Sequence, residues 1–304
     1  MAFIPPRRPV ITPVVQPPTL PRAFMEKGYV LPEQARKRGG SKYRGLMIAT
    51  EGRSDTGKTE FILSAPGPGV ILACDRGFDA VFDNQNPPPT RRNDFGIKPI
   101  PMPSVTDFQS PADYLPYYKN FYLSAIEASK LPEARTVAID GDNLSWSLQK
   151  LSEWGKLTTF PQVKFADPKA ARMSFYHELW SSGKIVITTN MMKQEWRDVV
   201  DADGLPVLDK NGERKGEPTG DYVAQGFPDQ EYLWQIRIRH LYRAAVTRKV
   251  LGKEIHVPQQ WGLRITKCKA NMALIGQELW GEQATFAGLV QFVYPNIPLE
   301  EWGF

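Results

Sequence analysis

The ten residues EGRSDTGKTE, at positions 51–60, constrain the fold of this chain more than any other stretch. They follow a short apolar run, GLMIAT, and they lead into EFILSA, which has the composition of a helix. Gly52, Gly57, Lys58 and Thr59 fit the spacing G-x-x-x-x-G-K-[ST], a loop that cradles phosphate groups between a strand and a helix. The glycines let successive N–H groups turn inward, and the helix adds its positive N-terminal end. The stretch therefore predicts a strand–loop–helix unit that binds a nucleotide.

The loop also predicts a set of ligand-binding residues. Within it, Lys58 is expected to reach the β and γ phosphates, and the Thr59 hydroxyl is expected to ligate magnesium. A second metal-binding carboxylate is expected at the end of a neighbouring strand, and TVAID ends at Asp140. Asp140 would alternatively be an N-cap for the next helix. The expected cofactors are ATP and Mg²⁺, and the candidate nucleotide-binding residues are Gly52, Arg53, Ser54, Asp55, Thr56, Gly57, Lys58 and Thr59.

Short apolar, β-branched segments alternate with helical segments after Tyr43. This alternation is typical of an α/β fold with a mostly parallel sheet covered by helices on both faces. The character changes after Asn190, where two turn signals, DADG and DKNG, predict a hairpin or a long loop. Two later strands are expected within YLWQIRIRHLYRAAV and WGLRITKC. The expected early strands are residues 46–50, 69–74, 136–140 and 184–190.

The ends of the chain differ from its middle. Residues 1–42 are rich in proline and end in a basic stretch, which predicts an extended N-terminal arm. Residues 43–275 are expected to form the core, with 191–232 as the hairpin or loop, and residues 276–304 form a separate C-terminal segment. The arm lacks the apolar centre of a secretory signal, and no apolar run approaches the roughly 20 residues of a membrane span. A cytoplasmic protein without a membrane partner is therefore expected.

Composition narrows the classes of site. Cys74 and Cys268 both lie in apolar segments, which favours buried thiols over a disulfide framework. With three scattered histidines, a zinc site is not expected. The net charge of +5 is mildly basic and is compatible with a polyanionic partner, although solvated basic faces are common in proteins that bind none.

The loop and the strands around it resemble those of RecA-like ATPases, and within them the small phage proteins linked to single-strand annealing. The resemblance covers roughly residues 43–270. It implies a RecA-like P-loop fold and a catalytic carboxylate after the second strand, where this chain has Asp75 although the family usually has glutamate. Asp75 would alternatively cap a loop. The resemblance also implies a γ-phosphate sensor at Asn190, and a K-x-K pair, Lys267 and Lys269, that reaches a neighbouring subunit's nucleotide.

The resemblance further implies that the 191–232 segment contacts DNA. Positive charge beside an aromatic ring suits single strands, because cations bind phosphates while a ring stacks on a base. A solvated hairpin with incidental charge is the alternative. The implied partners are single-stranded DNA, further copies of the chain in a filament or ring, and a single-strand-binding protein. The candidate DNA-binding residues are Lys193, Trp196, Arg197, Lys210, Arg214 and Lys215.

The predicted function is that of a DNA-stimulated ATPase that promotes annealing or strand exchange. Two alternatives are a ring-forming translocase or helicase of the same superfamily and a nucleotide-binding structural or adaptor protein with little turnover. The absence of a paired acidic motif after Asp140 is compatible with the second alternative. A small-molecule kinase is less well supported, because the sequence has no evident lid motif.

Overall fold

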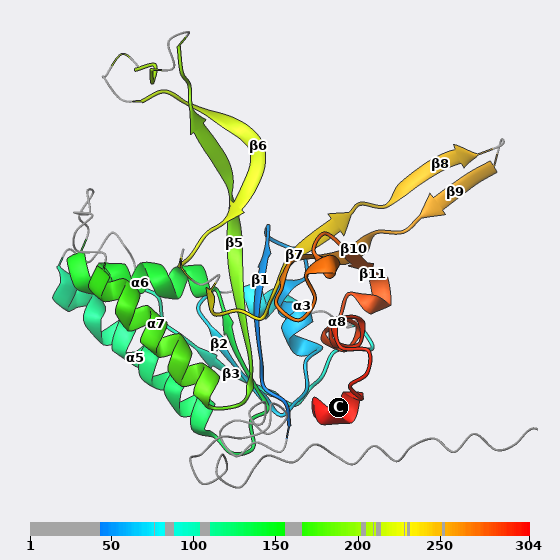
Figure 1. Ribbon diagram of the computed structural model, residues 1–304, viewed down its shortest axis with the longest axis horizontal. Helices are drawn as coiled ribbons and strands as arrows, with labels where there is room; N and C mark the ends of the chain where they lie inside the picture. The colour runs from blue at the N-terminus through cyan, green and yellow to red at the C-terminus, as the bar shows by residue number, and fades with distance from the viewer. Residues whose placement is uncertain are drawn as a thin grey trace, which may run out of the picture. The chain divides into compact units, whose positions relative to one another are not determined.

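The computed structural model describes residues 43–75, 77–82, 88–103, 110–155, 166–201, 205–208, 210, 214–227, 229, 232–250 and 253–304 (Figure 1). The fold is α/β, with a mostly parallel central sheet flanked by helices and with later antiparallel strands, as the sequence predicts. This arrangement is consistent with a RecA-like P-loop fold. The predicted arm, residues 1–42, lies outside the described residues.

The central sheet has the strand order β11-β10-β7-β1-β5-β4-β2-β3, and β6 pairs with β5. Strands β1 to β5 and β7 run parallel where they pair, whereas β10, β11 and β6 pair antiparallel with their neighbours. The phosphate-loop strand β1 therefore lies between β5 and β7. The strands are β1 (Leu46–Gly52), β2 (Gly69–Ala73), β3 (Phe95–Pro99), β4 (Thr136–Asp140), β5 (Ile185–Asp198), β6 (Gly216–Ala224), β7 (Ile236–Arg243), β10 (Gln260–Cys268) and β11 (Glu278–Trp280).

Apolar side chains alternate between the two faces of this sheet and build two cores. On one face, Ile48 and Ile187 pack with Phe61 of α3 (Lys58–Leu63) and Leu289 of α8 (Phe286–Val293). On the other, Met47 and its neighbours pack against α5 (Pro111–Lys130), α6 (Asp142–Trp154) and α7 (Ala166–Ser181) (Figure 1). The phosphate loop and Asp140 thus meet at the α3 face, at the carboxyl end of the parallel strands.

The predicted hairpin or loop after Asn190 is a hairpin. Strand β5 does not end there but continues for eight more residues, from buried positions into exposed ones. It pairs with β6, and two isolated bridges extend the pairing, between Val200 and Pro206 and between Leu208 and Arg214. Strand β5 therefore belongs to both the hairpin and the central sheet. It connects the hairpin to the carboxyl end of the parallel strands, where the phosphate loop lies.

Two features differ from the sequence expectations. Strand β3 is a parallel edge strand that the sequence does not predict. Its residues are half-buried or exposed and it ends at Pro99, so it lacks the apolar pattern of a buried strand. A second hairpin, β8 (Val246–Val250) with β9 (Lys253–Val257), connects β7 to β10. Helix α5 begins at Pro111, with Ser110 and Asp113 forming a capping box, and contains Pro116 in its interior.

The C-terminal segment packs on the same core. Strand β11 extends the sheet at β10, and Phe286, Val290 and Trp302 are buried against the α3 face. Cys74 and Cys268 are buried free thiols, as predicted. The helices in the described ranges are all too short or too polar to cross a membrane.

Candidate nucleotide-binding site

The phosphate loop joins the end of β1 to the start of α3, as the motif predicts. Gly57 has a φ of 88°, a left-handed conformation that favours glycine, and a Cβ there would lie 3.4 Å from the Trp261 ring. At Gly52 a Cβ would lie 2.5 Å from the Thr56 hydroxyl. Both glycines are therefore required by the path of the loop.

Lys58 lies over the loop that it is expected to serve. Its ammonium donates to the carbonyl oxygens of Gly52, at 3.2 Å, and Arg53, at 2.7 Å. Burial lowers the pKa of Lys58, while Asp140, Asp75 and Asp55 oppose this effect. The three carboxylates line the same cavity as Lys58, and a bound phosphate would compete with the loop carbonyls for its ammonium.

Asp140 is bonded to the motif residue that is expected to share its metal. The Thr59 hydroxyl donates to Asp140 Oδ2 at 2.8 Å, and the Thr189 hydroxyl donates to Oδ1 at 2.6 Å. The Gly141 N–H in turn donates to the Thr189 oxygen at 2.8 Å. Burial raises the pKa of Asp140, the two hydroxyl bonds oppose this, and the charge of Asp75 adds to it. The Asp140 carboxylate is therefore fixed in orientation by hydroxyl groups from two elements, α3 and β5.

Asp75 lies in the same cavity and also has the alternative role that the sequence left open. The cavity is lined by Asp75 and Asp140 together with loop residues from Ser54 to Glu60. Asp75 Oδ1 accepts the N–H of Gly77 at 2.9 Å, at the start of α4 (Gly77–Phe82). This contact fixes one oxygen of the Asp75 carboxylate, and the carboxylate remains in the cavity that the phosphate loop lines.

Sequence reasoning missed His240, which supports the loop. It is buried on β7, its ring meets Phe61 edge-on at 5.7 Å, and a Cβ added to Gly52 of the loop would lie 3.0 Å from the His240 Cβ. Burial, and then the charge of Lys58, lowers the pKa of His240 to about 3, so this imidazole is neutral. A lone histidine in a strand carries no spacing signal, so only the fold reveals it.

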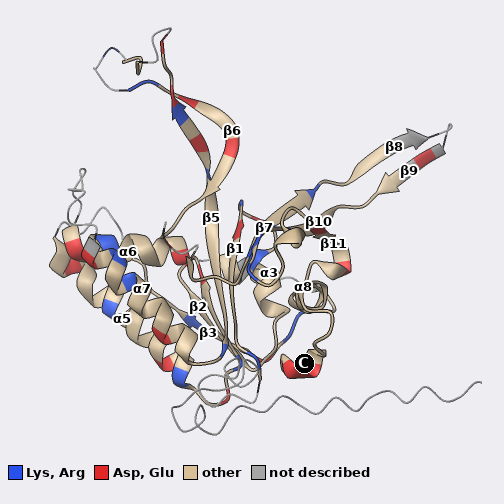
Figure 2. Ribbon diagram, in the orientation of Figure 1, with Lys and Arg blue, Asp and Glu red and all other residues tan. Residues whose placement is uncertain are grey.

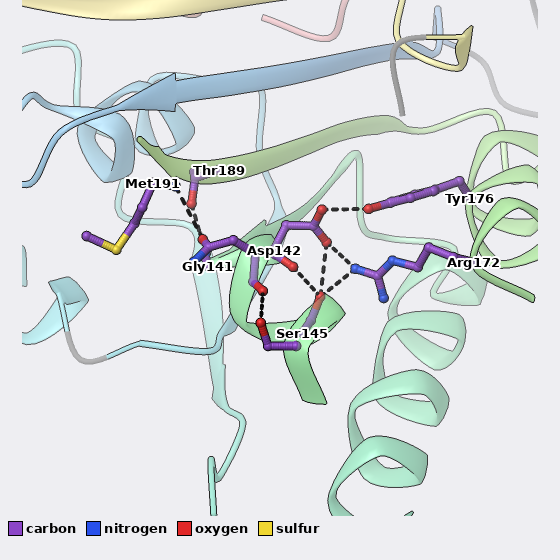
Figure 3. Close-up of polar contacts among 9 residues, drawn as sticks. Gly141, Asp142, Ser145, Arg172, Tyr176, Thr189 and Met191 are labelled. Atoms are coloured by element: carbon purple, nitrogen blue, oxygen red, sulfur yellow. Dashed lines mark hydrogen bonds and ion pairs between the residues drawn. The ribbon is translucent and has the colours of Figure 1, made fainter. Parts of the chain in front are cut away.

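A buried ion pair holds the segment that follows Asp140 (Figure 3). Asp142 Oδ1 accepts from Arg172 of α7 at 2.5 Å, and Oδ2 accepts from the Tyr176 hydroxyl at 2.5 Å. Both charged side chains are fully buried. Ser145 donates to Asp142 Oδ1 at 3.1 Å. The network fixes the start of α6, and with it the end of β4, against α7.

Asn190 lies on the other face of the sheet from Thr189, because side chains alternate along β5. Val186 of the same strand packs in the core beneath α5, α6 and α7, which is the face that Asn190 shares. Thr189 rather than Asn190 makes the contact with Asp140. The sensor role of Asn190 stays a prediction, and its neighbour Thr189 is the residue bonded to Asp140.

Lys267 and Lys269 lie on and just after β10, two strands from β1. Lys267 pairs in register with Arg237, next to a bulge in the strand, and Lys269 follows the last strand residue. The Lys269 ammonium donates to the Tyr232 carbonyl oxygen at 2.6 Å. Neither lysine lines the phosphate-loop cavity. A contact with a neighbouring subunit's nucleotide stays a prediction.

The candidate DNA-binding residues are on or beyond the hairpin strands; basic and acidic residues are interspersed on β5, whereas β6 carries only acidic ones (Figure 2). Arg197 forms an ion pair with Glu217 at 2.6 Å, and Arg214 forms one with Asp198 at 2.9 Å. Trp196 is 62% exposed. Lys193 lies at the base of the hairpin, and Lys210 and Lys215 are exposed. The two arginines are thus already balanced by carboxylates.

No family model matches the chain, and no curated protein matches its sequence. Among solved structures, one similar chain is the flagellar accessory protein FlaH from Methanocaldococcus jannaschii, at 14% identity and a TM-score of 0.38. The match covers 82% of this chain and 89% of that chain. The assignment of the site therefore depends on the geometry of this chain's own residues.

Proposed function

We propose that this protein binds ATP with Mg²⁺ at the loop Gly52–Thr59, hydrolyses it, and acts on single-stranded DNA in annealing or strand exchange of the phage type. The observation that carries the nucleotide site is the 2.8 Å hydrogen bond between Thr59 and Asp140. These residues are 81 positions apart, yet they meet beside Lys58 at the end of the parallel strands. That is the arrangement in which a P-loop holds a metal and a triphosphate.

The donor set fits magnesium. Mg²⁺ prefers oxygen ligands, and the Thr59 hydroxyl and the Asp140 carboxylate supply a neutral and an anionic oxygen from two elements. When bound, the ion neutralises charge that develops on the phosphates. Thr189 keeps Asp140 oriented, and Lys58 would exchange its loop carbonyls for phosphate oxygens. Asp75, which lines the same cavity after the neighbouring strand β2, would hold the proton of the attacking water.

Steady-state ATP turnover and ATP binding in Lys58→Ala and Asp75→Asn variants test this assignment. Lys58→Ala removes a phosphate ligand and should abolish binding. Asp75→Asn keeps the oxygen that caps Gly77 but cannot accept a proton, so ATP should still bind while turnover falls by about 10²-fold or more. Unchanged turnover in Asp75→Asn would make Asp75 a loop cap only. It would favour the alternative of a nucleotide-binding protein with little turnover.

The DNA part of the proposal has its own test. It is supported by the basic net charge of +5 and by a hairpin with an exposed tryptophan on a strand that continues into the nucleotide site. ATP turnover should rise when single-stranded oligonucleotide is added at low salt. DNA bound to the hairpin would contact β5, the strand that also carries Thr189 beside Asp140. If turnover stays constant at every salt concentration, the polymer has no role in the reaction.

A further inference from the structure

A second cavity, of about 830 Å³, lies on the sheet face opposite the phosphate loop. Helix α6, the base of the β5–β6 hairpin and the strand β7 each form part of its wall. Its charged lining residues are Lys150, Lys193, Arg237, Arg239 and Glu51. Four cations therefore face one carboxylate, which gives this cleft a net charge of +3. We name it the basic cleft.

The two arginines of the basic cleft are held in place. Arg237 and Arg239 lie two residues apart on β7, so their side chains share a face. Glu51, which is 2% exposed, accepts from the Nε of Arg237 at 2.8 Å and from that of Arg239 at 2.9 Å. One carboxylate thus orients two guanidinium groups, which keep 18% and 33% of their side-chain surface accessible. Oriented guanidinium groups are well suited to phosphate oxygens.

The two lysines of the basic cleft line it from separate elements, Lys150 from α6 and Lys193 from β5. Burial lowers the pKa of Lys150, and the charge of Lys193 lowers it further. The Lys150 ammonium lies 5.7 Å from the centre of the Trp146 ring. Within the described ranges, neither lysine forms an ion pair with a carboxylate. Two like charges held close together are stabilised by an anion between them.

The basic cleft differs in this respect from the hairpin above it. On the hairpin, Arg197 and Arg214 are each paired with a carboxylate in exposed ion pairs. The excess positive charge is therefore at the hairpin's base, where Lys193 begins the exposed part of β5. Three residues further along the same strand, Trp196 is 62% exposed and offers a ring on which a base can stack. Cations followed by an open aromatic ring suit a polynucleotide better than an acidic polypeptide.

From this arrangement we infer that the basic cleft binds the phosphate backbone of single-stranded nucleic acid, with Lys150, Lys193, Arg237 and Arg239 as its ligands. The inference deepens the proposed function and rests on its choice of polymer. The main contacts with the nucleic-acid phosphates are then in the basic cleft, at the hairpin's base, and not on the hairpin itself. Arg197 and Arg214 are then secondary contacts.

The test is fluorescence anisotropy of a labelled 20-nucleotide oligo-dT with the full chain, without nucleotide, over a range of salt concentrations. The cleft variant is Lys150→Gln with Lys193→Gln. The matched control, Lys98→Gln with Lys119→Gln, removes the same charge from exposed sites on β3 and α5. Each lost contact with a single strand lowers the salt slope by about 0.7, so the cleft variant should lose about 1.4 in slope and about tenfold in affinity. The control should stay within about twofold of the wild type.

Three results would overturn the inference: equal affinities in the cleft variant and the wild type, equal losses in the cleft variant and the control, or displacement of oligo-dT by polyglutamate of the same charge. Binding of a fluorescent ATP analogue to the same variants separates this failure from that of the nucleotide site. If ATP binds while the cleft variant binds oligo-dT normally, the cleft inference is wrong and the nucleotide site stands. If the wild type binds oligo-dT through the cleft but binds no ATP, the proposed ATPase is wrong.

Discussion

Thr59 has two roles that a single substitution can separate. Its hydroxyl is the expected metal ligand, and it also satisfies one oxygen of the buried Asp140 carboxylate. Thr59→Val keeps the shape of the side chain but removes the hydroxyl, so magnesium should no longer tighten ATP binding. We expect the ratio of ATP affinities with and without Mg²⁺ to fall about tenfold, measured by titration calorimetry in Mg²⁺ and in EDTA. Thr59→Ser keeps the oxygen and should behave like the wild type; equal losses in both variants would show that the hydroxyl is not the ligand.

His240 should make the stability of the fold depend on pH. Its pKa is about 3 in the folded chain and about 6.5 when unfolded, so below pH 6.5 the unfolded state binds a proton that the folded state does not. The stabilising effect is fully present above pH 6.5 and is lost as the pH falls towards 3. At about 1.4 kcal/mol for each pH unit, the loss in free energy of unfolding is about 3 kcal/mol by pH 4.

Urea unfolding of the wild type and of His240→Gln at pH 7 and at pH 4 measures this effect. The glutamine does not titrate, so the variant should lose less stability than the wild type between the two pH values. The difference between the two losses isolates His240 from the carboxylates, which titrate in both proteins. Identical losses would mean that the imidazole takes up its proton in the folded state.

Among the elements, α6 and α7 are connected by the Asp142–Arg172 pair, just after β4 ends at Asp140 (Figure 3). Removing one member of a buried ion pair leaves the other charge buried without a partner, which typically lowers the free energy of unfolding by about 3–5 kcal/mol. Arg172→Leu should therefore lower the free energy of unfolding by about that amount, measured by chemical denaturation. Arg172→Leu combined with Asp142→Asn should recover part of the loss, because no charge then remains buried. A double variant less stable than Arg172→Leu alone would contradict this account.

The elements differ in how far the sequence alone predicts them. Strands β1, β2 and β4 are short apolar runs with helices after them, and the local pattern predicts them because both of their faces are buried. The apolar pattern of β5 predicts a strand that ends at Asn190. Its continuation is held by pairing with β6, which is a contact with a distant segment and leaves no periodic signal. The edge strand β3 is missed because only part of it is buried.

The same distinction holds within the site. The phosphate loop and Asp140 can be predicted because their chemistry fixes both residue type and spacing. Thr189, His240 and the Glu51 ion pairs cannot, since each depends on which strands become neighbours in the sheet. The strand order places β5 between β1 and β4, and this insertion brings Thr189 to Asp140. Long-range pairing therefore decides the supporting residues, while local chemistry decides the ligands.

Assembly of several copies would let one chain complete the nucleotide site of its neighbour. Lys267 and Lys269 lie away from the chain's own phosphate-loop cavity, so any role in catalysis requires a neighbouring subunit. The variant Lys267→Ala with Lys269→Ala should bind ATP but turn it over slowly, because the charge on the γ-phosphate would lack its stabilising partner. Lys58→Ala should be inactive for the opposite reason, since it keeps both lysines but binds no ATP.

Mixing the two variants restores a complete site only where a subunit with intact Lys58 receives the lysines of its neighbour. ATP turnover should therefore reappear on mixing, reaching a fraction of the wild-type rate, and it should increase with total protein concentration as subunits associate. Sedimentation velocity with a non-hydrolysable ATP analogue measures that association independently. Additive, near-zero turnover in a mixture that sediments as an oligomer would assign the two lysines to a structural role within their own chain, where Lys269 already holds the Tyr232 carbonyl.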